Sequence, residues 1–272
     1  MSATNRLSAR PGEWIDRSKP VRFSFEGRDY TGFSGDTISS ALHANRVRLL
    51  GRSFKYHRPR GIFSFANHDI NAMVEDGADT NIRGDVTPIR EGAHYHAVNT
   101  FGGLRSDWGR YLDWFGRFLP VGFYYKTFHR PRAMFPFFEK RIRAMAGLGA
   151  INAKAPRLRT PKSYDFCDVL VIGSGAAGLT AGITAARHGA RVVVVDENRR
   201  PGGSLTYRPE HAPTLAKLLA EAKSLPTIDI RPLTVAAGCY ADHWVALVND
   251  ERLVKMRAKS VVIASGCFEL PA

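Results

Sequence analysis

Three glycines are spaced as in a loop that holds a phosphate-bearing cofactor. Gly173, Gly175 and Gly178 follow directly after an apolar run, Val169–Ile172. In this pattern the first glycine permits a tight turn, the second lets a pyrophosphate approach the backbone, and the third lets a helix pack closely on the strands. The unpaired N–H groups of the first helical turn, at the positive end of the helix dipole, would hold the phosphates.

An acidic residue follows at the distance expected for a nucleotide ribose. Asp196 lies 23 residues after Gly173 and ends a second apolar run, Val192–Val195. A carboxylate at this position can accept hydrogen bonds from the ribose hydroxyls. It also repels a 2′-phosphate, so the sequence favours NAD or FAD over NADP.

The elements that must position these residues are present. Val169–Ile172 and Val192–Val195 have the composition of strands buried on both faces. Between them Leu179–His188 is rich in helix formers and small residues, and Gly189 stops that helix. Strand, glycine turn, helix and strand form a βαβ unit, the context that distinguishes a dinucleotide site from a chance glycine turn.

The chain beyond Asp196 extends this domain. Glu197 and Asn198 would lie at the adenosine end of the ligand, and a second glycine turn, Gly202–Ser204, would face the same ligand. We expect four further elements: a helix over 212–224, a short parallel strand over 228–230, a hairpin of 244–248 with 252–257, and a buried strand over 259–266. These make only part of a Rossmann-like domain, so the chain is expected to be a fragment or to be completed by a partner.

The first hundred residues indicate a β-grasp layout. Val21–Phe25 alternates as a strand, and Asp29–Phe33 returns as the second strand of a hairpin. A helix should open with Asp36 or Thr37 as its N-cap. Further strands are expected over 71–77 and, at an edge, over 86–89.

The loop after that helix carries positive charge where plant-type ferredoxins carry cluster cysteines. Residues 49–69 contain no cysteine, so an iron–sulfur cluster is chemically excluded there. Residues 46–60 contain six cations and no acid: Arg46, Arg48, Arg52, Lys55, Arg58 and Arg60. The run is either a phosphate or nucleic-acid surface or a face that docks within a larger assembly. We favour docking because no nucleic-acid motif accompanies the charge.

Residues 101–163 differ in composition from the β-grasp region before them and the βαβ region after them. Between Trp108 and Phe138 there are 12 aromatic residues in 31 positions, interleaved with arginines. A flexible linker would be poor in aromatic residues. The segment is therefore expected to be buried, as core between the domains or as a subunit contact, and the linker itself is placed at Ala144–Arg159.

Composition narrows the protein class. Apolar content of 44% and charged content of 24% are those of a globular protein. The net charge of +14 is concentrated in residues 1–160, which carry +12, against +2 in residues 161–272. Cys167, Cys239 and Cys267 form neither a disulfide framework nor a metal-ligand pair, and no secretory signal opens the chain. We expect a cytoplasmic protein without a metal site.

Several longer motifs resemble one family. They are IDRSKPVRFSFEGRDYTGFSGDTISSALHAN near the start, GRSFKYHRPRGI at 51–62, PVGFYYKTF at 120–128, CDVLVIGSGAAGL at 167–179, VDENRRPGGSL at 195–205 and RAKSVVIASGCFELP at 257–271. Together they resemble the N-terminal part of the α subunits of heterotetrameric sarcosine oxidases. The α chains of proline, hydroxyproline and opine dehydrogenases look similar.

This resemblance implies a mixed α/β and α+β fold: a ferredoxin-like β-grasp without a cluster over 1–100, a docking segment over 101–163, and an incomplete FAD/NAD-binding Rossmann-like domain over 164–272. It implies NAD, with FAD as the alternative, in a site made by Gly173, Gly175, Ala177, Gly178, Asp196, Glu197, Asn198, Ser204, Val235 and Gly266. It implies FMN at the interface with a partner, and partner subunits of the β, γ and δ types. Neither nucleic acid nor membrane is expected as a partner.

The function implied is that of one component of an amine oxidoreductase. By this resemblance, sarcosine is converted to glycine and to either formaldehyde or methylene-tetrahydrofolate, with peroxide as the other product, and the amine is oxidised on a β-subunit flavin. No catalytic residue is assigned to this chain, and the isolated chain is expected to be inactive. Two alternatives stay open: a proline, hydroxyproline or opine dehydrogenase subunit that binds FAD, and a non-catalytic assembly subunit or fragment.

Overall fold

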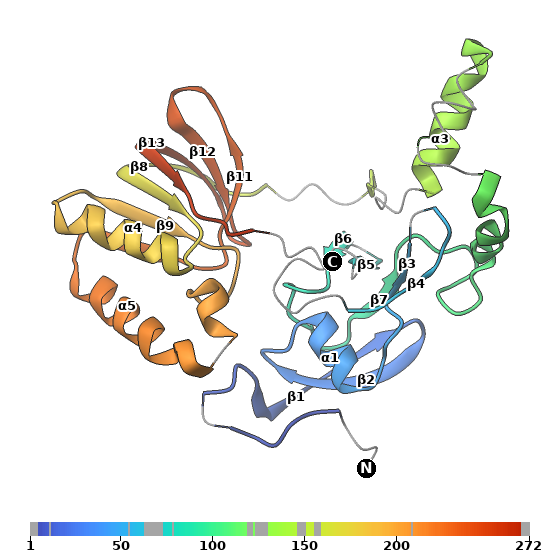
Figure 1. Cartoon of the computed structure of the whole chain (residues 1–272), viewed down its shortest axis with the longest axis horizontal. Helices are drawn as coiled ribbons and strands as arrows, with labels where there is room; N and C mark the ends of the chain where they lie inside the picture. Colours follow the sequence, from blue (N-terminus) through green and yellow to red (C-terminus); the bar gives the residue numbers. More distant parts are fainter. Residues whose placement is uncertain are drawn as a thin grey trace. The chain divides into compact units, whose positions relative to one another are not determined.

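A computed structural model describes residues 5–10, 12–53, 55–62, 73–77, 79–118, 122, 130–145, 151–154, 159–207 and 209–267. The chain divides into two compact units, residues 1–156 and 157–272 (Figure 1). The first unit contains β1 (Asp16–Phe25), β2 (Arg28–Ser34), α1 (Ile38–Ala44), β3 (Gly51–Arg52), β4 (Pro59–Arg60), β5 (Met73–Asp76), β6 (Asp79–Arg83), β7 (His94–Ala97), the 3-10 helices η2 (Trp108–Phe118) and η3 (Arg132–Met134), and α3 (Phe135–Met145).

The first unit is built on a mixed sheet in the order β2-β1-β7-β5-β6. The predicted β1–β2 hairpin is confirmed, and its turn places Glu26 and Gly27 at positive φ, as a tight hairpin requires. Thr37 caps α1, where its hydroxyl accepts from the backbone N–H of Ser40 in a capping box. The core includes Phe23, Phe25, Ile38, Leu42 and Tyr95.

The predicted edge strand over 86–89 is wrong. This segment makes one isolated bridge, between Thr37 and Pro88, and it runs past the start of α1. Its main-chain bonds, Ile38 N to Thr87 O at 3.0 Å and Ile89 N to Asp36 O at 3.1 Å, hold the helix entry. Pro88 has no N–H to donate, so a regular ladder cannot form through it.

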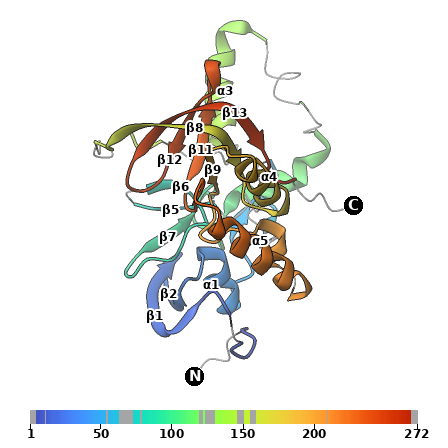
Figure 2. The same cartoon turned by 90° about the vertical axis from the view of Figure 1, so that its left-hand side faces the viewer.

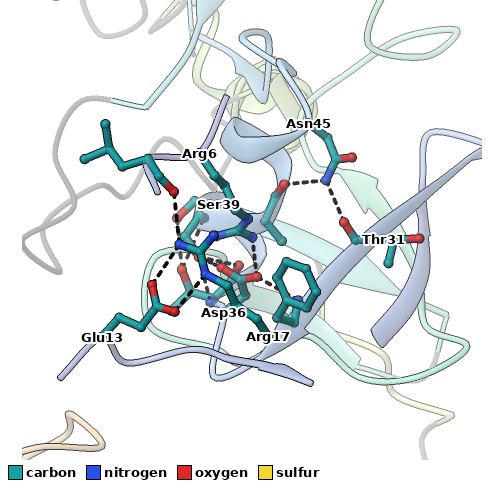
Figure 3. A network of polar contacts seen from close by, with 12 residues as sticks. Arg6, Glu13, Arg17, Thr31, Asp36, Ser39 and Asn45 are labelled. Atoms are coloured by element: carbon teal, nitrogen blue, oxygen red, sulfur yellow. Dashed lines mark hydrogen bonds and ion pairs between the residues drawn. The ribbon is translucent and has the colours of Figure 1, made fainter. Parts of the chain in front are cut away.

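The N-terminal segment is fixed to this unit by a buried ion pair. The guanidinium of Arg6 donates to Asp36, which also accepts from the Phe33 N–H and the Ser40 hydroxyl at 2.8 Å each (Figure 3). The side chain of Asp36 is 1% exposed and that of Arg6 is 14% exposed. Arg17 reinforces the segment by donating to Glu13 and to the Leu7 carbonyl.

Replacing Arg6 with alanine is expected to lower the free energy of unfolding of the first unit by about 3 kcal/mol, because it leaves a buried carboxylate without its cation. Arg17→Ala is the matched control, since its ion pair with Glu13 is more exposed and should matter much less. Urea unfolding followed by circular dichroism measures both. Equal, small effects of the two substitutions would contradict the assigned role of Arg6.

The second unit contains β8 (Lys162–Ile172), α4 (Ala176–Arg187), β9 (Val192–Val195), η4 (Gly203–Thr206), η5 (Pro209–His211), α5 (Ala212–Ser224), β10 (Ile228–Arg231), β11 (Val235–Cys239), η6 (Ala241–His243), β12 (Trp244–Val248) and β13 (Leu253–Ile263). Its sheet has the order β10-β9-β8-β13-β12-β11, with β8, β9 and β10 parallel. Helix α4 lies on the sheet and α5 lies beside α4 (Figures 1 and 2). The predicted βαβ unit is thus confirmed.

Strand β13 differs from the expectation of two separate strands. The hairpin arm and the returning strand form one element of 11 residues, paired with β8 from Leu253↔Lys162 to Ile263↔Ile172. Its final part was expected to be buried, yet Ile263 is 76% exposed.

The aromatic side chains of η2 were expected to be buried as core between the domains or as a subunit contact. Within this chain Trp108, Tyr111, Trp114 and Phe115 are exposed, so the chain itself does not bury them, and the subunit contact stays a prediction. The PVGFYYKTF motif lies almost wholly outside the described residues. Within the described ranges, no helix is long and apolar enough to span a membrane.

Candidate dinucleotide-binding site

The first glycine of the pattern makes the turn that leaves β8. Gly173 has φ +103°, and a Cβ there would lie 2.3 Å from the carbonyl oxygen of Ala264. Its N–H donates to Val195 O at 2.8 Å, and Ala264 N donates to Ile172 O at 2.7 Å. The turn is therefore enclosed by the ends of β9 and β13, and only glycine fits.

The third glycine sets the distance between α4 and the turn. A Cβ on Gly178 would lie 1.9 Å from the Gly173 carbonyl oxygen. One turn further along, a Cβ on Gly182 would lie 3.1 Å from the side chain of Val194 in β9. Both positions bring α4 close to the sheet, as the sequence predicts for Gly178.

The middle glycine leaves bare backbone at the start of α4. Gly175 is the N-cap residue, it makes no side-chain capping bond, and the first turn of α4 contains no acid. A Cβ there would meet nothing nearer than Gly203 Cα at 3.9 Å. The first N–H groups of α4, including that of Ala177, are therefore not capped by a local side chain, which suits an anion.

A second glycine turn packs against the first. Gly202 donates its N–H to Ser174 O at 2.9 Å. Gly203 has φ +52°, and a Cβ there would lie 2.9 Å from Gly175 Cα. Ser204 follows in η4. The predicted second turn thus borders the same N-terminus of α4.

Asp196 lies at the end of β9, but its carboxylate faces the protein. One oxygen accepts from the backbone N–H of Ser174 at 2.7 Å and from the Ser174 hydroxyl. The other accepts from the backbone and side-chain nitrogens of Asn198, each at 2.8 Å. A carboxylate has about four acceptor positions, and these four bonds use them. Sequence reasoning missed Ser174, which is 0% exposed, because the residue between the first two glycines is unspecified in the pattern.

The remaining predicted residues surround the same edge of the sheet. Thr234 N donates to Asp196 O at 2.8 Å and Leu233 N to Asn198 O at 3.0 Å, which places Val235 beside the end of β9. Gly266 follows β13 at φ +82°, two residues beyond the Ala264 carbonyl that covers Gly173. The ten predicted residues therefore gather at the carboxyl ends of β8, β9 and β13, where ligands bind in open α/β sheets.

The opposite end of the sheet holds a separate open cavity of about 700 Å³, lined by charged residues and Cys167. Its cations are neutralised locally: Lys259 lies 2.7 Å from Asp168, and Arg191 lies 3.0 Å from Asp165. The hydrogen bond from Lys259 lowers the pKa of Asp168. This internal pairing makes the amino end a poor anion site.

Cys167 is expected to resist alkylation. Burial raises the pKa of its thiol to about 11, so roughly one molecule in a thousand carries the reactive thiolate at pH 8. Cys239 and Cys267 are exposed. Mass spectrometry after iodoacetamide treatment of the native protein should find these two labelled and Cys167 unlabelled, while all three are labelled in urea. Equal labelling of Cys167 in the native protein would contradict this packing.

These features define a class of chain, in which a ferredoxin-like domain is joined to a domain that resembles the FAD-dependent oxidoreductases. Residues 168–227 match the family described as "FAD dependent oxidoreductase", and residues 18–100 match the family described as "2Fe-2S iron-sulfur cluster binding domain". The crystal structure of L-proline dehydrogenase from P. horikoshii shares the fold, with a TM-score of 0.58 and 17% identity over 92% of this chain and 41% of that one.

More particularly, the chain is a homologue of sarcosine oxidase α subunits. It is 38% identical to the sarcosine oxidase α subunit of Rhizobium meliloti (strain 1021), over 94% of this chain and 29% of the relative. It is also 36% identical to an opine oxidase subunit of Rhizobium meliloti, over 39% of this chain and 24% of the relative. The chain spans between 25% and 29% of the length of three sarcosine oxidase α subunits.

An iron–sulfur cluster does not fit the ferredoxin-like domain. A [2Fe–2S] cluster of the ferredoxin type needs four cysteine thiolates, whereas the matched residues 18–100 contain none. In the loop after α1 the structure instead buries His57, whose Nδ1 lies 2.7 Å from the carboxylate of Asp107. That hydrogen bond joins the loop to the start of η2.

Proposed function

We propose that this chain is an α-subunit-like component of a multi-subunit, flavin-dependent oxidoreductase that oxidises a secondary amine such as sarcosine. Its own part is to hold an adenine dinucleotide at the carboxyl ends of β8 and β9. The observation that supports this most is the bare backbone at Gly175, between two packed glycine turns and beside the uncapped N-terminus of α4.

The residues present fit such a ligand. The pyrophosphate would lie on the N–H groups at the start of α4, between Gly175 and Ser204. We assign the ribose contact to Glu197, which directly follows Asp196 and is half-buried. We assign a positioning role to Asp196, whose carboxylate accepts from Ser174 and Asn198. Val235 and Gly266 would border the ligand. A bound dinucleotide would supply an acceptor for two electrons.

The chemistry of the amine belongs to the assembled complex in this proposal. A flavin on a β-type subunit would take two electrons from sarcosine, and hydrolysis of the resulting imine gives glycine and formaldehyde. Dioxygen would take the two electrons from the reduced flavin and become hydrogen peroxide. Where tetrahydrofolate is present, the methylene unit would pass to it instead of being released as formaldehyde. FMN would lie where this chain meets that subunit, with γ and δ types completing the complex.

A second candidate is a component of an opine or proline dehydrogenase type that holds FAD in the same site. The homology to an opine oxidase subunit favours it. Both candidates require an adenine dinucleotide, and they differ in which one.

The test is the nucleotide that the purified protein carries. The chain is denatured, and the supernatant is separated by chromatography and identified by mass spectrometry. NAD supports the sarcosine oxidase type and FAD supports the second candidate. If the protein carries neither NAD nor FAD, and millimolar NAD or FAD does not shift its thermal unfolding, the dinucleotide site is refuted.

A further inference from the structure

The basic loop and the aromatic segment, which lie far apart in sequence, form one surface. Three contacts join the loop between β3 and β4 to η2 and to Asp107, which directly precedes η2. Arg58 donates to Asp113 from two nitrogens, at 2.9 and 2.8 Å. His57 Nδ1 lies 2.7 Å from Asp107, and the Tyr56 hydroxyl donates to Gly116 O at 3.4 Å.

The joint is rigid. His57 and Asp107 are both 0% exposed. Asp107 also accepts from the backbone N–H groups of Phe101 at 2.9 Å and Gly109 at 3.2 Å. The ring of Phe101 stacks on His57 at 5.0 Å, and a Cβ on Gly109 would lie 2.6 Å from His57 Nδ1. A surface fixed in this way needs little ordering when a partner binds.

This surface displays large rings that the fold does not cover. The exposed fractions are 65% for Trp108, 79% for Trp114 and 57% for Phe115. Leaving such side chains in water forgoes about 2 kcal/mol each of burial free energy. Aromatic residues and arginine are the residue types enriched where proteins bind one another.

The charge of this surface indicates the chemistry of its binding partner. Arg58 and Arg60 in and beside the loop, and Arg105 and Arg110 in and beside η2, are all exposed. Of the two carboxylates of η2 and its entry, Asp113 is paired with Arg58 and Asp107 is buried. The excess positive charge disfavours a second copy of this chain and favours an acidic face.

We propose that η2, with β3, β4 and the loop between them, docks on an acidic face of the flavin-carrying subunit, whose identity as the partner rests on the proposed function. The rings of Trp114 and Phe115 enter apolar pockets of that subunit, and Arg105 and Arg110 meet carboxylates around them.

The experiment is isothermal titration of this chain into the β subunit of the Rhizobium meliloti sarcosine oxidase, purified without its α subunit. The double substitution Trp114→Ala with Phe115→Ala should weaken binding about 100-fold, as expected for two interface hot spots. Arg105→Ala with Arg110→Ala should weaken it and reduce its dependence on salt. The matched control is Tyr240→Ala, which removes a ring that is 66% exposed in the second unit. Circular dichroism verifies that each variant is folded.

Failure of the unmodified chain to bind, or equal binding by the Trp114/Phe115 variant and the Tyr240 control, would overturn the proposal. Ring-dependent binding to phosphatidylserine-containing vesicles or to a single-stranded oligonucleotide, without binding to the β subunit, would also overturn it. Nucleotide content is measured on the same samples. If the chain binds the β subunit but carries no nucleotide, only the proposed dinucleotide site is refuted. If it carries nucleotide but does not bind the β subunit, only the proposed docking surface is refuted.

Discussion

Alanine at Gly175 is expected to weaken the binding of an adenine dinucleotide about 100-fold while leaving the second unit folded. Gly175 has φ −69°, which alanine adopts freely, and its Cβ would meet nothing nearer than 3.9 Å. The methyl group would instead project where a pyrophosphate must approach the backbone. A loss of this size corresponds to about 3 kcal/mol. Isothermal titration with NAD and with FAD measures it, and thermal unfolding verifies the fold.

Gly178→Ala provides the contrast, because its Cβ would lie 1.9 Å from a backbone oxygen that cannot move without opening the turn. Overpacking of this kind costs about 3 kcal/mol of stability. The second unit should therefore unfold at a lower temperature, and binding should fail with the fold. Unchanged affinity in Gly175→Ala would mean that no phosphate contacts this backbone, and the proposed site would have to be abandoned.

The parts of the fold that follow from local pattern could be predicted from the sequence. Helix 212–224 and strand 192–195 have the expected bounds, because an apolar stripe or run is flanked at both ends by residues that stop the element. The glycine spacing likewise predicted the turn after β8, since Gly173 and Gly178 each lie where a Cβ would meet the backbone.

Features that depend on distant partners could not be predicted in this way. Whether Lys259–Ile263 continues the hairpin arm is decided by β8, which pairs along the whole of β13. Segment 86–89 has a strand-like composition, yet its main-chain groups form hydrogen bonds with residues at the start of α1 instead of with a strand. The joint between His57 and Asp107 crosses 50 positions of sequence, and no periodicity reveals a contact of that kind.

The same limit applies to Asp196, where spacing correctly identified an acid at the end of β9 but could not show which way its carboxylate faces. Asp196→Ala is expected to destabilise the second unit by about 4 kcal/mol, because it leaves the buried donors of Ser174 and those of Asn198 without their shared acceptor. Circular dichroism during urea unfolding measures the change. Ser174→Ala should give a smaller loss in the same direction, since it removes one of the four bonds.

Glu197→Gln is expected to behave in the opposite way. The free energy of unfolding should change by less than about 1 kcal/mol, because glutamine has nearly the same shape as glutamate and the side chain is only half-buried. Affinity for NAD or FAD should fall about tenfold, because a ribose hydroxyl donates more strongly to a charged acceptor than to an amide. Discrimination against NADP should fall as well, because the charge that repels a 2′-phosphate is gone. Should Asp196→Ala instead stay fully stable and lose the nucleotide, while Glu197→Gln binds normally, Asp196 is the ribose acceptor and its bonds to Ser174 and Asn198 must open when the ligand enters.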